Sequence, residues 1–149
     1  YRGGLGYLFL ESKVFELLSV YLSEVLELSI LSSSYISISK SDRDSITEAK
    51  RIIDSQLAFA PSCEELAKKV NISVSKLTKG FNSLFGTSVH AYIIDQRLEK
   101  AAGLLLESDL NVSQIATLVG YSKPSNFAAA FKKKYGVIPK NYKDENTIG

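Results

Sequence analysis

The feature that most constrains the fold is a repeat within the second half of the 149-residue chain. Residues 66–86 match residues 115–136, with an offset of 49 at the start of each copy and 50 at its end. One residue is therefore inserted in the second copy. Each copy is too short to bury an apolar face alone, so the two copies must pack on a shared core. The second half of the chain is thus expected to fold as two similar units.

Each copy has the pattern of two helices joined by a tight turn. Asn71 in the first copy and Gly120 in the second are residue types that tolerate a left-handed backbone. Such a residue lets one helix end and the next begin at a steep angle. Ser73 and Ser122 follow these turns, and we expect their hydroxyls to cap the second helices. The repeat therefore predicts a helix-turn-helix, twice.

Apolar spacing and capping residues predict the helices around the repeat. Residues 88–107 keep a helical period and join the two copies as one long helix. Ser41 is suited to cap an earlier helix, and residues 62–65 and 111–114 have the pattern of capping boxes. No strand pattern is present. We expect an all-α fold, with two helix-turn-helix subdomains joined by a long linking helix and preceded by an amphipathic N-terminal helix.

The N-terminal helix is predicted by apolar residues spaced by three and four within residues 8–31, with acidic residues on much of the opposite side. Its apolar stripe needs a cover, either an upstream part of the protein or a second copy of the chain in a homodimer through residues 8–31. Serines crowd residues 31–41, where the helical period is lost, and predict a linker. We therefore divide the chain into residues 1–40, with this helix and the serine-rich linker, and residues 41–149, with the double helix-turn-helix.

The distribution of charge favours a polyanionic partner for the second half. From Pro61 onward there are twelve Lys and Arg residues against eight acids, whereas the preceding sixty residues have six against eight. A basic excess on one half of a chain is typical of contact with a nucleic acid. We expect double-stranded DNA as the main partner.

Composition excludes several other functions. A single cysteine, Cys63, allows no internal disulfide, and a single histidine, His90, leaves no cluster for zinc or for His-based catalysis. We expect no cofactor, no metal and no enzyme activity, with alkyl transfer to the Cys63 thiol as the enzymatic alternative. No apolar run approaches 18 residues, and the first residues lack a secretion signal. We therefore expect a cytoplasmic protein with no membrane partner.

The candidate DNA contacts lie on the second helix of each copy, opposite its apolar residues. Hydroxyls, amides and ammonium groups suit base edges in a major groove, and alanine suits a thymine methyl group. The expected base contacts are Ser75, Lys76, Thr78, Lys79, Ser125, Asn126 and Ala129. The expected phosphate contacts are Asn82, Lys123, Lys132, Lys133 and Lys134. Because Ala128 and Ala129 belong to the second copy's set, we expect the first copy to supply most of the base discrimination.

Residues 115–142, which read IATLVGYSKPSNFAAAFKKKYGVIPKNY, resemble the AraC/XylS-type transcription regulators, and the likeness extends over residues 41–143. The resemblance implies a bacterial activator whose two subdomains enter successive major-groove segments on one face of DNA, with RNA polymerase as a further partner. It implies base contacts at Ser75, Thr78, Lys79, Ser125, Asn126 and Ala129. The sequence departs from the family pattern at Asn71, where glycine is common, and at Ala129, where a polar or basic residue often sits.

The N-terminal segment LFLESKVFELLSVYL resembles the helix that precedes the DNA-binding domain in siderophore-responsive members. Regulators of this type carry a sensing domain upstream, so we expect the chain to be the DNA-binding portion of a longer protein. The alternative from another functional class is a protein-interaction module. In that case residues 8–31 pair helices, and the helix-turn-helix units serve only as a scaffold.

Overall fold

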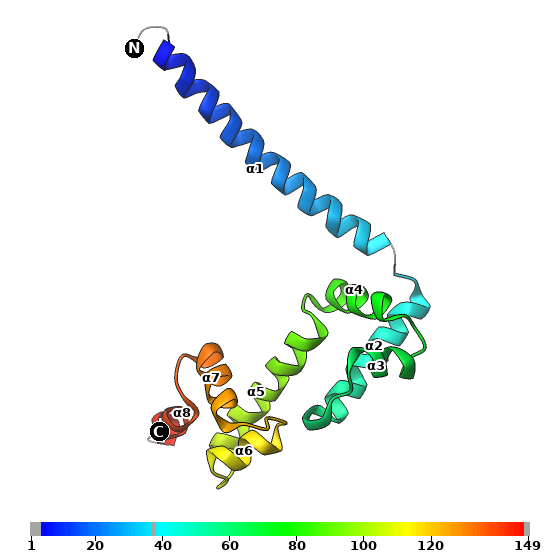
Figure 1. Ribbon diagram of the computed structural model, residues 1–149, viewed down its shortest axis with the longest axis vertical. Coiled ribbons are helices and arrows are strands. Elements are labelled where there is room, and N and C mark those ends of the chain that lie inside the picture. The colour runs from blue at the N-terminus through cyan, green and yellow to red at the C-terminus, as the bar shows by residue number, and fades with distance from the viewer. Residues whose placement is uncertain (1–3, 37, 148–149) are drawn as a thin grey trace. The chain divides into compact units, whose positions relative to one another are not determined.

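The computed structural model describes residues 4–36 and 38–147, which form eight α-helices and one 3-10 turn with no β-strand among them (Figure 1). The prediction of an all-α fold is confirmed. Contacts divide the chain into two compact units, Tyr1–Ser39 and Lys40–Gly149. The helix-turn-helix pairs all lie in the second unit.

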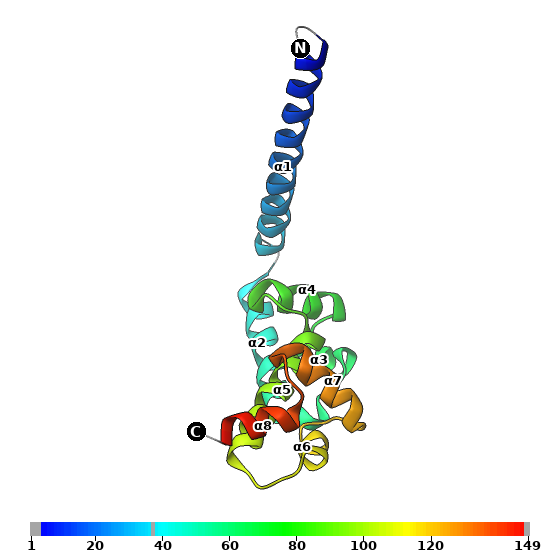
Figure 2. The ribbon, with the colours of Figure 1, turned by 90° about the vertical axis from the view of Figure 1, so that its left-hand side faces the viewer.

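The first unit contains the helix α1 (Gly4–Ile36), drawn in blue in both ribbon views (Figures 1 and 2). The prediction of a linker is wrong over residues 31–36, because α1 continues to Ile36 and the next helix already begins at Lys40. A serine in a helix costs only roughly half a kcal/mol relative to alanine. Residues 7–36 also contain no glycine or proline that would end the helix. Ser37 lies outside the described residues.

The side chains of α1 are described between residues 11 and 27, and in this stretch every large apolar side chain is exposed. They are Val14, Phe15, Leu17, Leu18, Val20, Tyr21, Leu22, Val25 and Leu26. The side chains at the two ends of the predicted stripe, residues 8–10 and 28–31, lie outside this range. None of the helices described combines the length and the apolar character needed to cross a membrane.

The second unit begins with α2 (Lys40–Ser55), so Ser41 lies in its first turn and not at its N-cap. The 3-10 turn η1 (Leu57–Phe59) connects α2 to the first helix pair, α3 (Cys63–Lys69) and α4 (Val74–Phe85). Helices α2, α3 and α4 contact one another. Their buried apolar side chains are Ile46, Ala49, Ile53, Leu66, Ala67, Leu77 and Phe81.

The linking helix α5 (Val89–Glu107) follows its N-cap Ser88 and leads to the second pair, α6 (Val112–Leu118) and α7 (Pro124–Tyr135). The last helix is α8 (Pro139–Thr147). Figure 1 shows α2 and α3 on one side of α5, and α7 and α8 on the other. The core of this half is formed by Leu98, Ala101, Ala102, Leu105, Ile115, Ala116, Val119, Phe127 and Phe131. Helix α5 thus supplies part of the core on which the second pair packs, as the repeat required.

Both turns have the predicted left-handed residue, with φ of 60° at Asn71 and 105° at Gly120. Ser73 caps α4 as predicted, because its hydroxyl oxygen accepts from the Lys76 amide at 3.1 Å. The prediction that Ser122 caps the matching helix is wrong. The N-cap of α7 is Lys123, and Pro124 follows at the start of the helix. The inserted residue of the second copy therefore moves the helix start by one position.

The short first helices of the two pairs are also capped by side chains. At α3 the Ser62 oxygen accepts from the Glu65 amide at 3.2 Å. At α6 the capping box is complete, since Asn111 accepts from the Gln114 amide at 2.8 Å and the Gln114 side chain accepts from the Asn111 amide at 2.9 Å. These bonds satisfy amides that the helix itself leaves free.

Candidate DNA interface

Helix α4 presents the first set of predicted contacts to solvent. Its buried residues are Leu77, Gly80 and Phe81, and their spacing leaves the polar face outside. The side chains that are exposed on α4 are Ser75, Lys76, Thr78, Lys79 and Asn82. All five sequence-predicted contacts of the first copy are therefore accessible. Their hydroxyls, amide and ammonium groups can donate to base edges and phosphates.

Two of these side chains already have partners within the protein. The Thr78 hydroxyl donates to the Val74 carbonyl at 3.0 Å, which leaves its oxygen free to accept. The Lys76 ammonium lies 3.4 Å from the carboxylate of Asp42, on α2. Sequence reasoning missed Asp42, because an ion pair between two helices has no local pattern. Lys79 has its ammonium on the same exposed face without a partner within the described residues.

Helix α7 presents a smaller polar face. Phe127 and Phe131 are buried, and the predicted base contacts Ser125, Asn126 and Ala129 are exposed. Ala128, which the sequence placed in the outward set, is half-buried. Only two side chains on this face can form hydrogen bonds with bases, so α7 has less capacity for direct readout than α4.

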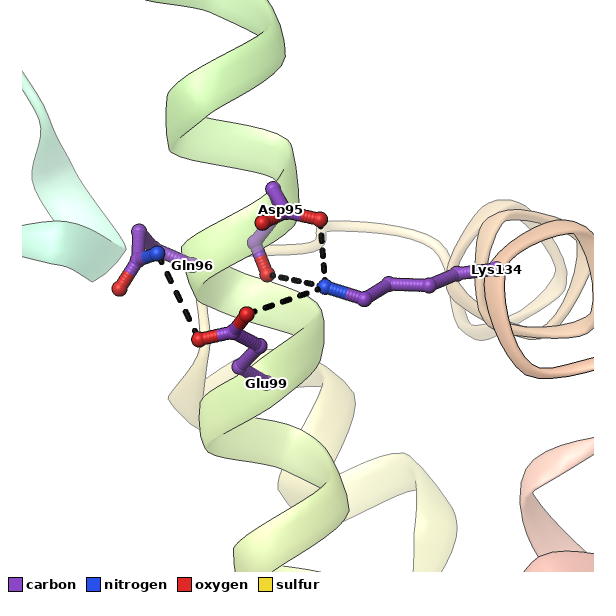
Figure 3. A network of polar contacts seen from close by, with 4 residues as sticks. All are labelled: Asp95, Gln96, Glu99 and Lys134. Atoms are coloured by element: carbon purple, nitrogen blue, oxygen red, sulfur yellow. Dashed lines mark hydrogen bonds and ion pairs between the residues drawn. The ribbon is translucent and has the colours of Figure 1, made fainter. Parts of the chain in front are cut away.

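The predicted phosphate contacts of the second copy fall into two groups. Lys123, Lys132 and Lys133 are exposed and free to reach a phosphate. The Lys134 ammonium instead points to α5, where it binds the Asp95 carboxylate and lies 3.4 Å from the Glu99 carboxylate (Figure 3). Lys134 would have to leave two carboxylates to contact DNA.

The surroundings of Lys134 act on its pKa in opposite directions. Burial alone lowers the pKa, but the hydrogen bond to Asp95 and the charges of Tyr135, Asp95 and Glu99 together raise it. The ammonium form is therefore favoured by the network. Two acids four residues apart on α5 are the sequence signal that could have revealed this role, since like charges on one helix face need a cation.

The residues considered for other chemistry do not form a site. Burial, and secondarily the charge of Glu64, raise the pKa of the Cys63 thiol, so its nucleophilic thiolate form is disfavoured. His90 is exposed in the first turn of α5. Within residues 4–36 and 38–147, no three His, Cys, Asp or Glu side chains are placed to hold a metal ion.

Comparison with known proteins matches residues 66–145 to a protein-family model described as a helix-turn-helix domain. The xylose operon regulatory protein of Escherichia coli strain K12 is 32% identical over 102 residues, which are 68% of this chain and 26% of that protein. The chain therefore spans about a quarter of the length of this curated relative.

Two solved structures share the fold at appreciable sequence identity. The C-terminal domain of the two-component response regulator yesN from Fusobacterium nucleatum is 32% identical with a TM-score of 0.58, covering 63% of this chain and 91% of that one. The DNA-binding domain of AdpA, described as a global transcriptional factor and solved in complex with a target DNA, is 26% identical with a TM-score of 0.64. That match covers 67% of this chain and 90% of the AdpA chain.

Proposed function

The chain belongs to the helix-turn-helix family of AraC-type transcription regulators and carries their DNA-binding domain, and we propose that α4 and α7 read two successive major-groove segments on one face of duplex DNA. One observation carries the proposal: two repeated helix pairs each expose a polar face directly opposite buried apolar residues. The solved complex of AdpA with DNA supports the class of partner. Paired recognition helices need half-sites about one helical turn, roughly 34 Å, apart.

The two helices divide the work unequally in this proposal. Helix α4 supplies most of the base discrimination through Ser75, Lys76, Thr78 and Lys79. On α7, Ser125 and Asn126 add hydrogen bonds, and Ala129 allows close approach to the groove or contact with a thymine methyl group. Asn82, Lys123, Lys132 and Lys133 bind phosphates and fix the register of the protein on DNA.

Replacement of Lys79 by alanine tests the readout by α4. The operator is first selected from a random duplex library with the unmodified chain, and affinity is then measured by fluorescence anisotropy for every base change in the selected site. We expect Lys79→Ala to cost about 1–3 kcal/mol of binding and to relax discrimination at one position, because an ammonium on guanine is a specific contact.

Lys69→Ala is the matched control, since Lys69 is exposed on α3 outside the proposed contacts. This variant should bind the selected site as the unmodified chain does. A loss for Lys79→Ala that is uniform across all sequences would show that Lys79 contacts a phosphate. If the unmodified chain enriches no sequence at all, the proposed readout is wrong.

The family membership supports three further parts of the proposal. We infer that the DNA-bound protein contacts RNA polymerase, activates transcription and works in the cytoplasm, because the likeness to bacterial AraC-type regulators implies these properties. The curated relative is named for the regulation of an operon, which agrees with this role. The relatives described above give no support to the siderophore-responsive subtype that residues 8–22 suggested.

A second proposal concerns α1, whose large apolar side chains between residues 11 and 27 are all exposed; Phe15 is 70% exposed and Leu17 is 71% exposed. We propose that two copies of the chain pair through this helix, because each copy then covers the apolar surface of the other. Sedimentation of the full chain and of residues 40–149 tests the pairing. A dimer for the full chain and a monomer for residues 40–149 are expected, and a monomer in both cases would exclude it.

A further inference from the structure

A clamp between the two subdomains centres on Arg97, in the middle of α5. Its Nε donates to the Leu57 carbonyl at 3.0 Å in a partly buried position. Leu57 opens η1, the turn that leads from α2 to α3, and so belongs to the first subdomain. A charged donor bound to a backbone carbonyl in a partly buried position is a directional, charge-assisted link. The linking helix is thus fixed to the first subdomain beyond its own covalent connection.

The turn of the second pair packs on the same place. A Cβ atom added at Gly120 would lie 2.7 Å from the Ala58 carbonyl oxygen and 3.0 Å from the guanidinium carbon of Arg97. These distances are too short for a real side chain, so the Gly120 backbone is in direct contact with η1 and with Arg97. The turn between α6 and α7 therefore contacts both η1 of the first subdomain and the linking helix α5 at Gly120.

Tyr121, the next residue, adds to this junction. Its hydroxyl is buried and has no hydrogen-bond partner within the described part of the chain. Burial raises the pKa of this hydroxyl, and the charge of Arg97 opposes part of the rise.

The other side of α5 holds the second recognition helix. Residues two apart on an α-helix point in roughly opposite directions, so Asp95 and Arg97 serve different sides of α5. Asp95 and Glu99 bind Lys134 on α7 (Figure 3). The second pair is thus tied to α5 through Lys134 and to the first subdomain at Arg97 and Gly120.

We propose that Arg97 is a positioning residue that fixes the distance and angle between α4 and α7, and thereby restricts the protein to one spacing of two half-sites in DNA. This inference rests on the proposed function. Two linked binding modules gain affinity from each other only when both sites can be occupied at once. An inserted base pair turns one half-site by about 34° around the DNA axis, so a rigid clamp should reject it.

The experiment measures affinity for the selected operator and for operators with one, two or three base pairs inserted between the half-sites. We expect the unmodified full chain to bind the two-base-pair insertion about 100-fold more weakly than the operator, on the order of the gain from linked sites. For Arg97→Ala this ratio should fall to about 10-fold or less, while affinity for an isolated half-site stays unchanged. A purely structural role would weaken every DNA alike and leave the ratio as it was.

Arg97→Lys keeps the charge but loses the planar guanidinium group. If circular dichroism shows that Arg97→Ala is unfolded, the same affinity ratio is measured for Arg97→Lys instead. Lys100→Ala, which removes an exposed charge from the same helix, is the control and should keep the full ratio. An unchanged ratio in a folded Arg97 variant overturns the inference. Failure of the unmodified chain to prefer any sequence would instead overturn the proposed function, so the two failures are distinguishable.

Discussion

At the scale of single residues, Gly120 is the position where the fold leaves the least room for change. Its φ of 105° is strained for any other residue, and an added Cβ would clash with the Ala58 backbone. We expect Gly120→Ala to lower the free energy of unfolding by about 2–4 kcal/mol, the sum of backbone strain and overpacking. Urea unfolding followed by circular dichroism measures the loss.

Gly136→Ala separates the two contributions, because Gly136 also has a left-handed backbone, with φ of 81°, but nothing within 4 Å of an added Cβ. This variant should lose only the strain, about 1 kcal/mol. Equal losses in the two variants would contradict the close packing of Gly120 on η1.

The pKa of Lys134 predicts how the stability of the fold changes with pH. Its pKa is raised in the folded protein, so its network stabilises the fold fully below the ordinary lysine pKa of about 10.4 and loses this effect as pH rises through the folded value. The melting temperature of Lys134→Met should therefore lie below that of the unmodified chain at pH 8, and the difference should shrink above pH 10.5.

Lys133→Met is the control for this comparison, because Lys133 is exposed beside it without such a network. Its melting temperature should follow that of the unmodified chain at every pH. A Lys134→Met difference that stays constant through alkaline pH would show that the carboxylates contribute nothing to stability.

Residue identity alone predicted the roles that depend on local backbone geometry. Asn71 and Gly120 were expected to have positive φ because few residue types tolerate it, and both do. The partner of Lys134 could not be predicted in this way, because Asp95 is 39 positions away. A run of three lysines indicates phosphate contacts by composition, and the folded chain shows that Lys134 is instead bound to carboxylates of α5.

At the scale of elements, the caps set where each helix begins. We expect Asn111→Ala to lower the free energy of unfolding by about 1 kcal/mol, because it removes the cap of α6 and half of the capping box. Ser122→Ala should change it by less than about 0.5 kcal/mol, since Ser122 is exposed and α7 starts after Lys123. Thermal unfolding of both variants checks the pair, and equal losses would mean that Ser122 has a structural role.

Three boundaries predicted from serines are wrong: the linker over residues 31–36 and the caps at Ser41 and Ser122. Serine costs little inside a helix, so a cluster of serines at residues 31–36 did not stop α1, although Ser62, Ser73 and Ser88 do cap helices. Proline and glycine act more strongly. Pro124 starts α7, and Gly86 and Gly136 end α4 and α7 in the left-handed conformation.

At the scale of the whole molecule, the repeat determined most of what could be predicted. Two copies of one pattern predicted two helix pairs, a linking helix between them and the exposed polar faces of α4 and α7, because buried and exposed residues alternate with the helical period. The relation between the pairs depends on Arg97 and Gly120. Their contacts join segments about 40 and 60 residues apart, which no local pattern records.

In the proposed complex, both recognition helices act on one face of the same DNA. Hydroxyl-radical footprinting of the selected operator tests this arrangement most directly, because the method maps each protected sugar along both strands. Two protected segments centred about 10 base pairs apart on the same face are expected. A single protected segment, or two segments on opposite faces of the duplex, would contradict it.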